Sequence, residues 1–331
     1  MPTYNRVDVV LRTLDTLFRQ DFPPEQFEIV VVSDGSTDGS VERLRSLRPS
    51  CSFRIIEQEN RGLAGARNSG LYAAGAPLVL FLDDDMFCAP ALVSAHVAAQ
   101  TQNRGTVGIG AFFLSSDSVG NLASDCFLKE LGAFHVAHQQ SPGLPLQTAD
   151  YVFGNTSAPR ELLLRAGGFD ERFRMREDAE LAFRLRKGGV EFRYVPDAVA
   201  YEHYTKSPKE LVEDALRFAA ADALFLEKHP EFYPASALAR IARQPAWRRV
   251  ARRVLRRVPG MLTHILPFCW SVLGRFRHWP FFRRMGVLVL QVHRSLVWSE
   301  HMSSVCKASD WNYHLNQSSG NGVDRLSSTE W

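Results

Sequence analysis

Three consecutive aspartates, Asp83, Asp84 and Asp85, directly follow the apolar run Leu78–Leu82. A short apolar run of this kind predicts a buried parallel strand, and ligands of open α/β sheets lie at the carboxyl ends of such strands. Adjacent carboxylates repel one another, so a nearby cation would stabilise them. Mg²⁺ and Mn²⁺ prefer oxygen ligands and often bridge carboxylates to substrate phosphates. The triplet therefore indicates a metal site, with a solvated acidic turn as the alternative.

The pattern around the triplet alternates between helices and strands. Helices are predicted over 7–20, 41–47 and from 60 onward, and strands over 27–32, 53–56 and 78–82. This order predicts an α/β domain with a parallel sheet and right-handed crossovers. Further strands are predicted over 107–113, 151–158 and 192–195, and helices over 160–166, 178–187 and 211–227, the last packing on the sheet. Residues 115–150 are expected to form helix and loop around an acceptor site.

Composition limits the class of protein. With 331 residues and 45% hydrophobic content, the chain can bury the core of one large domain with an appendage. The five cysteines are scattered without a CxxC pair, which indicates a reducing compartment and no structural zinc site. The N-terminus has no pattern of a signal peptide, so we expect a cytoplasmic protein.

Charge is distributed unevenly along the chain. Residues 232–299 contain thirteen arginines and no Asp or Glu, although the net charge of the whole chain is only +3. The remainder holds 26 basic and 36 acidic residues, a net charge of −10. The arginine-rich region is therefore suited to an anionic surface and the rest of the chain is not.

The arginine-rich region has the pattern of an amphipathic arm. Residues 246–258 place apolar side chains on one helical face and arginines on the others, and the apolar runs Met261–Leu273 and Met285–Val292 are shorter than the ~20 residues of a membrane span. This predicts a peripheral helical region at the inner face of the cell membrane, bound to anionic lipid. Nucleic acid is not an expected partner, because the aromatic residues alternate with aliphatic ones. The alternative is packing on the catalytic domain or dimerisation.

The predicted organisation has three parts. Residues 1–235 form the catalytic domain, 236–300 the membrane-associating helical region, and 301–331 a disordered tail rich in Ser, Asn and Gly.

Residues 2–204 resemble glycosyltransferase family 2, whose catalytic domain has the GT-A fold. The resemblance rests on five motifs in the family's order, each weak alone: Pro2-Thr3-Tyr4-Asn5, Asp34-Gly35-Ser36-Thr37-Asp38, Asn60-Arg61-Gly62 with Ala66-Arg67-Asn68, Asp83-Asp84-Asp85, and Glu177-Asp178 followed by Arg184. It implies a Rossmann-like, mostly parallel central sheet with flanking helices, followed here by the basic amphipathic arm.

The resemblance also implies a binding site for a nucleotide-diphosphate sugar. Thr3 and Tyr4 would line the base pocket, and Asp34 would accept a hydrogen bond from the base, unless it only caps the following turn. Arg67 would contact the diphosphate or Asp34, with a solvated helix residue as the alternative.

The metal in such a site would be Mg²⁺ or Mn²⁺, which neutralises the departing diphosphate. The family pattern implies that Asp85 coordinates it directly and that Asp83 serves both the ribose and the metal. Asp84, between them, contributes less to the donor site. His203 would complete the metal or diphosphate site, although a lone histidine is often structural.

Transfer with inversion requires a base that takes a proton from the acceptor hydroxyl. The family places this base in the Glu177-Asp178 pair, which implies Asp178 as the base and Glu177 as a residue that orients the acceptor. A helix N-terminus favours a carboxylate in any case, so an N-cap role for Asp178 is the alternative. Gly154 and Asn155 resemble the sugar and acceptor pocket.

One feature departs from the family pattern. Relatives usually have four or five apolar residues before the Pro-Thr-Tyr-Asn motif, forming the first central strand, whereas only Met1 precedes Pro2 here. We therefore expect this strand to be missing from the sequence as given, with its neighbours unpaired and the base pocket weakly supported.

The expected function is sugar transfer from a nucleotide-diphosphate donor to a hydroxyl of a glycan or lipid-linked acceptor. A nucleotidyltransferase is one alternative, but it should carry a glycine-rich, basic phosphate loop after its first strand, and residues 2–6 lack one. A non-catalytic membrane-bound protein that binds nucleotide sugars is the other alternative.

Overall fold

The computed structural model describes residues 1–140, 153–258 and 260–305. The chain divides into two compact units, Met1–Pro208 and Lys209–Trp331, and each is described by itself. The predicted boundary near residue 235 stays a prediction.

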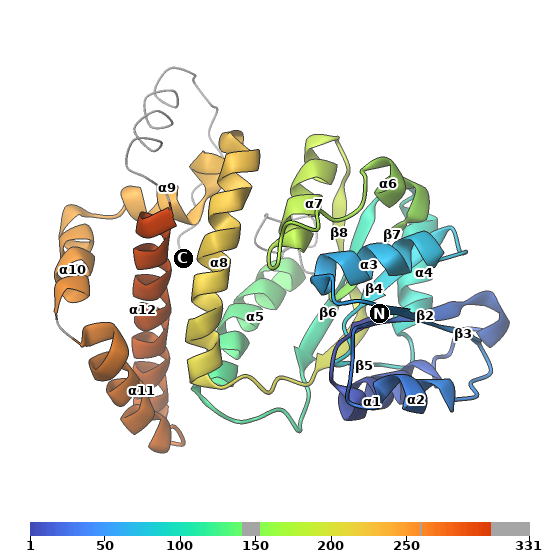
Figure 1. Cartoon of the computed structure of the whole chain (residues 1–331), viewed down its shortest axis with the longest axis horizontal. Coiled ribbons are helices and arrows are strands. Elements are labelled where there is room, and N and C mark those ends of the chain that lie inside the picture. The colour runs from blue at the N-terminus through green and yellow to red at the C-terminus, as the bar shows by residue number, and fades with distance from the viewer. Residues whose placement is uncertain (141–152, 259, 306–331) are drawn as a thin grey trace. The chain divides into compact units, whose positions relative to one another are not determined.

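The strands of the first unit form two sheets (Figure 1). One sheet has the order β1-β2-β3 and is parallel throughout. The other has the order β4-β7-β6-β8-β5, in which β6 and β8 are parallel, β7 is antiparallel to β4 and β6, and β5 is antiparallel to β8. Their bounds are β1 Pro2–Thr3, β2 Glu28–Asp34, β3 Ser52–Gln58, β4 Leu78–Leu82, β5 Met86–Cys88, β6 Val107–Leu114, β7 Asn155–Pro159 and β8 Phe192–Glu202.

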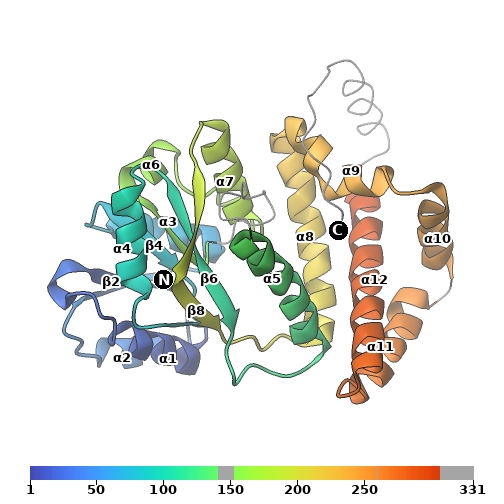
Figure 2. The ribbon, with the colours of Figure 1, turned by 180° about the vertical axis from the view of Figure 1, so that it is seen from behind.

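Helices cover these strands on both sides. Helix α3 packs on β1, β2 and β3, whereas α4 packs on β6, β7 and β8. Figure 1 shows α3 in front of the strands, and Figure 2, seen from behind, shows α4 in front of them. The helices of this unit are α1 Val7–Leu17, α2 Ser40–Arg45, α3 Gly62–Ala73, α4 Leu92–Gln102, α5 Leu122–Gln140, α6 Arg160–Arg165 and α7 Glu177–Lys187, with a short 3-10 turn η1 Pro24–Gln26.

Strand β4 is packed on both faces, as its continuous apolar sequence predicts, but it was expected to be parallel and instead pairs antiparallel with β7 at the edge of its sheet. Phe81 packs edge-on against Phe153 and Phe169, with ring centroids 5.6 and 5.2 Å away. The next residue, Leu82, joins a second core cluster that contains Leu14 of α1. Because both faces of β4 are packed, the strand is held in place, and it thereby fixes the position of Asp83, the first residue of the acidic triplet.

Three further elements of this unit differ from the sequence-based expectation. Residues 86–88 form strand β5 and residues 92–102 form helix α4, neither of which the periodicity predicted. The first strand, expected to be missing, is present as a two-residue strand whose Pro2 and Thr3 pair with Val32 and Ser33.

The second unit is helical. Its elements are α8 Pro208–Lys228, η3 Pro230–Ala235, α9 Ala237–Ala242, α10 Ala246–Arg257, η4 Met261–Ile265, α11 Leu266–Arg275 and α12 Pro280–Val305. Residues Ala215 and Ala219 of α8 share a core with Trp298 and Met302 of α12. The predicted packing of α8 on the sheet stays a prediction. Helix α12 includes the start of the predicted tail, and residues 306–331 lie outside the described part. No helix in the described ranges is long and apolar enough to cross a membrane.

Candidate active site

Asp84 is the most strongly held member of the acidic triplet. Its carboxylate accepts hydrogen bonds from Thr3 Oγ1 at 2.7 Å and from Arg6 Nη1 at 2.8 Å. Its backbone oxygen accepts a third from Thr13 Oγ1 at 2.6 Å. Asp84 is buried, so these bonds join β4 to β1 and α1. The family pattern gives Asp84 a smaller part in the donor site, which stays a prediction, and the structure adds an anchoring role.

Arg6 is a site residue that the sequence reasoning did not single out. It precedes α1, and its guanidinium bridges Asp84 and Asp85, with Nη2 3.0 Å from Asp85 Oδ2. The one signal in the sequence was its position directly after the motif Pro2-Thr3-Tyr4-Asn5. Arg6 therefore offsets part of the negative charge at the end of β4.

Arg67 of α3 lies at the centre of the site and is only 3% exposed. Its Nη2 is 2.8 Å from Asp83 Oδ1, and its Nη1 is 2.7 Å from Glu177 Oε1. The guanidinium also lies over the Phe169 ring, 5.6 Å from the centroid. The alternative of a solvated helix residue is thus excluded. Of its two predicted partners, Asp34 makes no hydrogen bond to Arg67 in the structure, and the diphosphate contact stays a prediction.

Glu177 and Asp178 begin α7. Glu177 is buried against Arg67, whereas Asp178 is partly exposed and its Oδ1 accepts a hydrogen bond from the backbone N–H of Ala179 at 2.7 Å. The helix is capped by Arg176, whose φ of 67° is left-handed, so Asp178 is not the N-cap residue. Burial raises the pKa of Asp178, and burial together with the Asp178 charge raises the pKa of Glu177 to about 7. The base role of Asp178 stays a prediction.

The end of β4 carries an excess of negative charge. Burial and the neighbouring Asp85 raise the pKa of Asp84 to about 7, even though Arg6 acts in the opposite direction. Burial also raises the pKa of Asp85. Glu202, at the end of β8, has a pKa raised to about 8 by burial and by the charges of Asp85 and Asp83. Glu202 is a second residue that the sequence reasoning passed over, although it directly precedes His203.

These residues suit a hard divalent cation. Asp83 Oδ2, Asp85 Oδ1 and the Glu202 carboxylate accept no hydrogen bond from any described residue. Within the described ranges, no three His, Cys, Asp or Glu side chains are gathered closely enough to enclose a metal. Mg²⁺ needs only one or two protein carboxylates when substrate phosphates supply further ligands. Asp83 and Asp85 can meet that need.

His203 contacts the triplet through its backbone rather than its ring. Its N–H donates to the backbone oxygen of Asp85 at 2.8 Å. The ring stacks on Phe87 with centroids 5.6 Å apart, and Nδ1 lies 3.2 Å from Asp117 Oδ1. The ring is therefore held by Asp117, and its predicted role as a metal ligand stays a prediction.

The three residues predicted to bind the base have different surroundings. Thr3 is buried, and its hydroxyl donates to Asp84. Tyr4 is half exposed. Asp34 is buried and accepts hydrogen bonds from Gln58 Nε2 at 2.6 Å and from the backbone N–H groups of Arg61 and Gly62 at 2.9 and 2.8 Å. Asp34 thus holds the start of α3, and a carboxylate keeps room for one more donor. Its predicted contact with a base stays a prediction.

Asn155 has a structural role, which corrects its assignment to the sugar or acceptor pocket. Its side chain is 2% exposed and donates from Nδ2 to the backbone oxygens of Ala111 and Ala198 at 3.0 and 2.8 Å. Its Oδ1 lies 3.0 Å from Nε2 of His96. Gly154 does lie at the site, because a Cβ there would meet Asp83 Oδ2 at 2.7 Å. Only a glycine leaves room for the Asp83 carboxylate.

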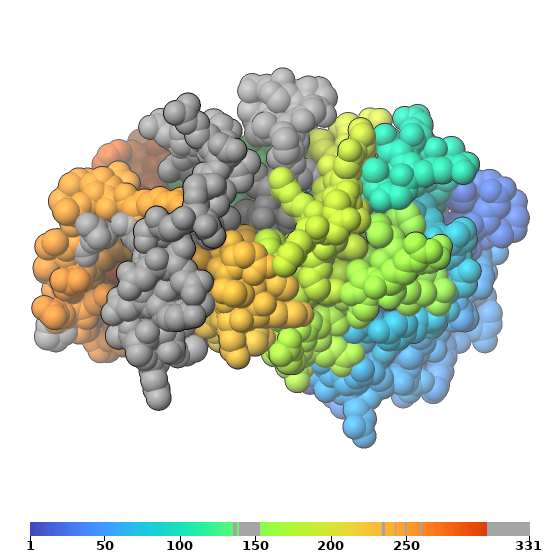
Figure 3. All heavy atoms as spheres, turned by 90° about the horizontal axis from the view of Figure 1, so that it is seen from above, coloured from blue at the N-terminus to red at the C-terminus, as the bar shows by residue number. Residues whose placement is uncertain are grey.

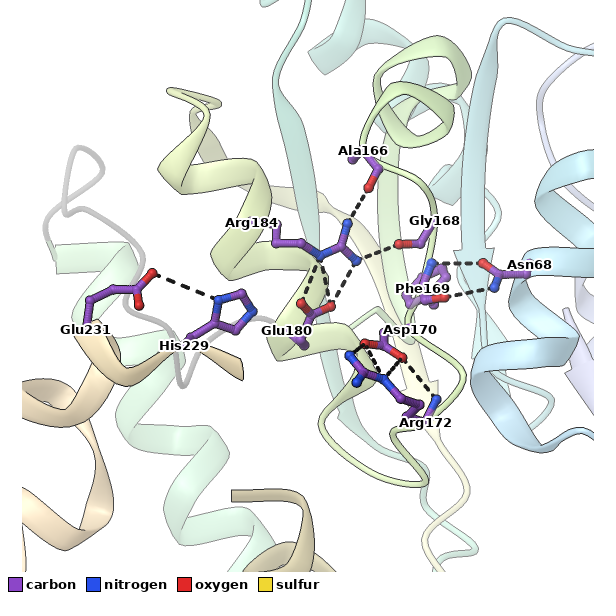
Figure 4. Close-up of polar contacts among 10 residues, drawn as sticks. All are labelled: Asn68, Ala166, Gly168, Phe169, Asp170, Arg172, Glu180, Arg184, His229 and Glu231. Carbon is purple, nitrogen blue, oxygen red and sulfur yellow. Dashed lines mark hydrogen bonds and ion pairs between the residues drawn. The ribbon is translucent and has the colours of Figure 1, made fainter. Parts of the chain in front are cut away.

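The turn over residues 167–170, between α6 and α7 in the chain, is hydrogen-bonded to both α3 and α7 (Figure 4). Asn68 binds the backbone of Phe169 through both ends of its amide, at 2.8 and 2.9 Å. Arg184 of α7 donates to the backbone oxygens of Ala166 and Gly168 and pairs with Glu180. Figure 3 shows α3 beside the green atoms of α6 and α7. The predicted motifs around Asn68 and Arg184 therefore orient the elements that carry Arg67, Glu177 and Asp178.

Comparisons with known proteins agree with this geometry. Residues 1–158 match the family described as Glycosyl transferase family 2. The chain is 32% identical over 267 residues to a validoxylamine A glucosyltransferase of Streptomyces hygroscopicus subsp. limoneus, covering 71% of this chain and 57% of that protein. It is 28% identical over 263 residues to chondroitin synthase of Escherichia coli, covering 70% of this chain and 38% of that protein. The chain thus spans less than two thirds of the length of these relatives.

Among solved structures, the chain is similar to a mannosyltransferase of Pyrobaculum calidifontis in complex with GDP-Man and Mn²⁺. The TM-score is 0.62 at 21% identity, and the match covers 92% of this chain and 86% of that one. This similarity confirms the predicted α/β GT-A fold. Together with the sequence matches, it shows that residues 1–158 belong to glycosyltransferase family 2.

Proposed function

We propose that this protein transfers a sugar, with inversion, from a nucleotide-diphosphate donor to a hydroxyl of a glycan or lipid-linked acceptor. The observation that carries the proposal is the position of Arg67 between Asp83 and Glu177. This arrangement puts the donor-side acids at the end of β4 next to the pair that would supply the base at the start of α7. Membership of family 2 supports the same reading.

The roles of the residues follow from their positions. Thr3, Tyr4 and Asp34 bind the nucleoside, while Asp83 and Asp85 face the diphosphate. Asp178 takes the proton from the acceptor hydroxyl as that oxygen attacks the anomeric carbon. Burial raises the pKa of Asp178 and thereby makes it a stronger base than a free aspartate.

Asp83 and Asp85 would hold Mg²⁺ or Mn²⁺ together with the donor phosphates. The cation, when bound, stabilises the negative charge that develops on the departing diphosphate. Mn²⁺ in the structure of the mannosyltransferase supports this assignment. Before a donor binds, Arg6 and Arg67 hold the carboxylates in place.

A turnover assay separates the enzyme from a binding protein on the same fold. We expect the purified chain to release nucleoside diphosphate from one of a panel of UDP- and GDP-linked glucose, N-acetylglucosamine and mannose when Mn²⁺ is present. Release should stop on chelation. Donor binding without release, across the panel and with a range of acceptor sugars, would favour the non-catalytic alternative. Release of pyrophosphate from a nucleoside triphosphate and a sugar phosphate would instead favour the nucleotidyltransferase.

A further inference from the structure

Helix α10 turns its apolar face toward solvent. Trp247, Val250 and Val254 lie on one side of this helix, and each is more than half exposed. Two of its arginines point toward α12 instead, where Arg252 Nη1 donates to Ser295 Oγ at 2.6 Å and Arg256 Nη1 to the backbone oxygen of Ser299 at 3.3 Å. A helix on the surface of a water-soluble protein normally packs its apolar face inward. The opposite orientation leaves that face available to an apolar environment.

A second exposed apolar group lies where α11 meets α12, and Figure 2 shows this end of the two helices. We name it the arm tip, and it consists of Phe276, Trp279, Phe281, Phe282 and Met285, all exposed. The rings of Phe276 and Phe281 each contact that of Phe282, with centroids 5.6 and 5.5 Å apart. These side chains thus form one apolar cluster that is exposed to solvent. Single exposed apolar residues are common on protein surfaces, but a cluster of them indicates a binding surface.

Not every tryptophan of the arm is available at the surface. Trp298 is buried and donates from Nε1 to Asp222 Oδ2 at 2.8 Å, and Trp270 donates to His293 Nδ1 at 3.2 Å. Both side chains therefore pack against other helices of the second unit. Trp247 and Trp279, which are 66% and 59% exposed, are available at the surface.

Arginines accompany both exposed groups. Six of them are exposed and form no ion pair with any described residue: Arg248, Arg253 and Arg257 on α10, and Arg275, Arg283 and Arg284 at the arm tip. Arg253 and Arg257 also line a shallow hollow with Arg256 and Glu300. Since residues 232–299 contain no acid, a negatively charged partner for these arginines must come from outside that stretch.

We propose that α10 and the arm tip bind the surface of an anionic lipid bilayer. Exposed Trp and Phe side chains next to arginines are suited to the boundary between headgroups and acyl chains, and the arginines attract anionic headgroups. A second copy of the chain fits less well, because it would bring arginine against arginine. In this mode of binding, α10 and the arm tip lie at the surface of the bilayer and do not cross it. The described ranges contain no spanning helix. The proposal does not depend on the chemistry of the active site.

Co-sedimentation of the full chain with vesicles tests this proposal. We expect the protein to pellet with phosphatidylcholine vesicles that contain phosphatidylglycerol, to stay in the supernatant with phosphatidylcholine alone, and to be released by high salt. The double substitution Trp279→Ser with Phe281→Ser should lower the affinity for the anionic vesicles by about tenfold or more, because it removes two apolar rings that would enter the bilayer. The double substitution Arg283→Gln with Arg284→Gln should lower the affinity for the anionic vesicles and make that affinity less dependent on salt concentration.

The matched control is Leu128→Ser, an exposed apolar residue of α5 in the first unit, which should leave vesicle binding unchanged. Circular dichroism checks that each variant is folded. The proposal is overturned if the full chain stays in the supernatant with anionic vesicles at low salt, or if the arm-tip variant binds as the parent does. It is also overturned if sedimentation velocity shows a dimer that the arm-tip substitutions dissociate.

Discussion

The guanidinium of Arg67 donates from Nη1 to Oε1 of Glu177 at 2.7 Å, and both side chains are buried. The two residues are 110 positions apart in the sequence. Their pairing joins α3 to α7, while the other arm of the guanidinium holds Asp83 at the end of β4. One cation thus keeps the carboxylates of Asp83 and Glu177 at a fixed separation.

Removing that cation should destabilise the fold. Arg67→Ala leaves the buried Glu177 and the partly buried Asp83 without their partner, so we expect the free energy of unfolding to fall by about 3–5 kcal/mol. Urea denaturation followed by circular dichroism measures this. Arg165→Ala, which removes an exposed pair with Glu161, is the matched control and should change stability by no more than about 0.5 kcal/mol. Equal effects of the two substitutions would argue against a central role for Arg67.

Arg6 should compete with the metal in stabilising the acids at the end of β4. Arg6→Gln removes the partner of Asp84 and Asp85, so the melting temperature without metal should fall. A divalent cation can replace the lost positive charge, and the increase in melting temperature produced by Mg²⁺ should therefore be larger in the variant than in the parent. Thermal unfolding with and without Mg²⁺ gives both values. The reading of Arg6 is wrong if the Mg²⁺-induced increase is the same.

His96 should make stability depend on pH. Burial lowers its pKa to about 4, from 6.5 for an exposed histidine, and it lies 3.0 Å from Asn155 Oδ1 and 2.9 Å from Ser157 Oγ. The ring is neutral in the folded state, so the unfolded state takes up the proton as pH falls from 6.5 toward 4. Folding stability should decrease over that window by ~1.4 kcal/mol per unit of pKa shift.

The buried acids complicate a direct measurement of this effect, because their raised pKa values favour the folded state as pH falls. The comparison with His96→Gln isolates the histidine. The variant should be less stable than the parent at neutral pH, and this difference should shrink at low pH. A difference that stays constant between pH 4 and 6.5 would mean that His96 does not titrate as its burial implies.

Asp178→Asn should separate chemistry from binding. Among the described residues, its carboxylate accepts a hydrogen bond only from the N–H of Ala179, and asparagine can keep that bond. We expect unchanged donor affinity and a loss of transfer by a factor of about 10²–10⁴, the usual contribution of a general base. Steady-state transfer rates and donor titrations measure the two. Glu191→Gln, on an exposed residue, is the control, and a near-parent transfer rate in Asp178→Asn would leave the residue a structural role only.

The predicted secondary structure was most accurate where periodicity and turn chemistry agree. The strand before Asp83 ends where its apolar run ends, and the helix over 246–258 was found to within one residue. Strand β5 was missed because three residues are too few to show a period. Helix α4 was missed because its apolar residues are spread around the helix rather than along one face.

The motifs identified the location of the site, but they did not give the role of each residue. Asp83, Arg67 and Glu177 lie together as the family pattern implies. Whether Asn155 faces a ligand or the core depends on His96, Ala111 and Ala198, which come from three other elements. Arg6 and Glu202 were missed for the same reason, because only the folded chain brings them beside the triplet.

The central claim is that the end of β4 binds a divalent cation together with a nucleoside diphosphate. Isothermal titration calorimetry of UDP and GDP, with and without Mn²⁺, tests it most directly in the parent and in Asp85→Asn. The account predicts Mn²⁺-dependent binding of one of these nucleotides to the parent and its loss in Asp85→Asn, with both proteins folded by circular dichroism. Equal, metal-independent affinity in the two proteins would contradict it.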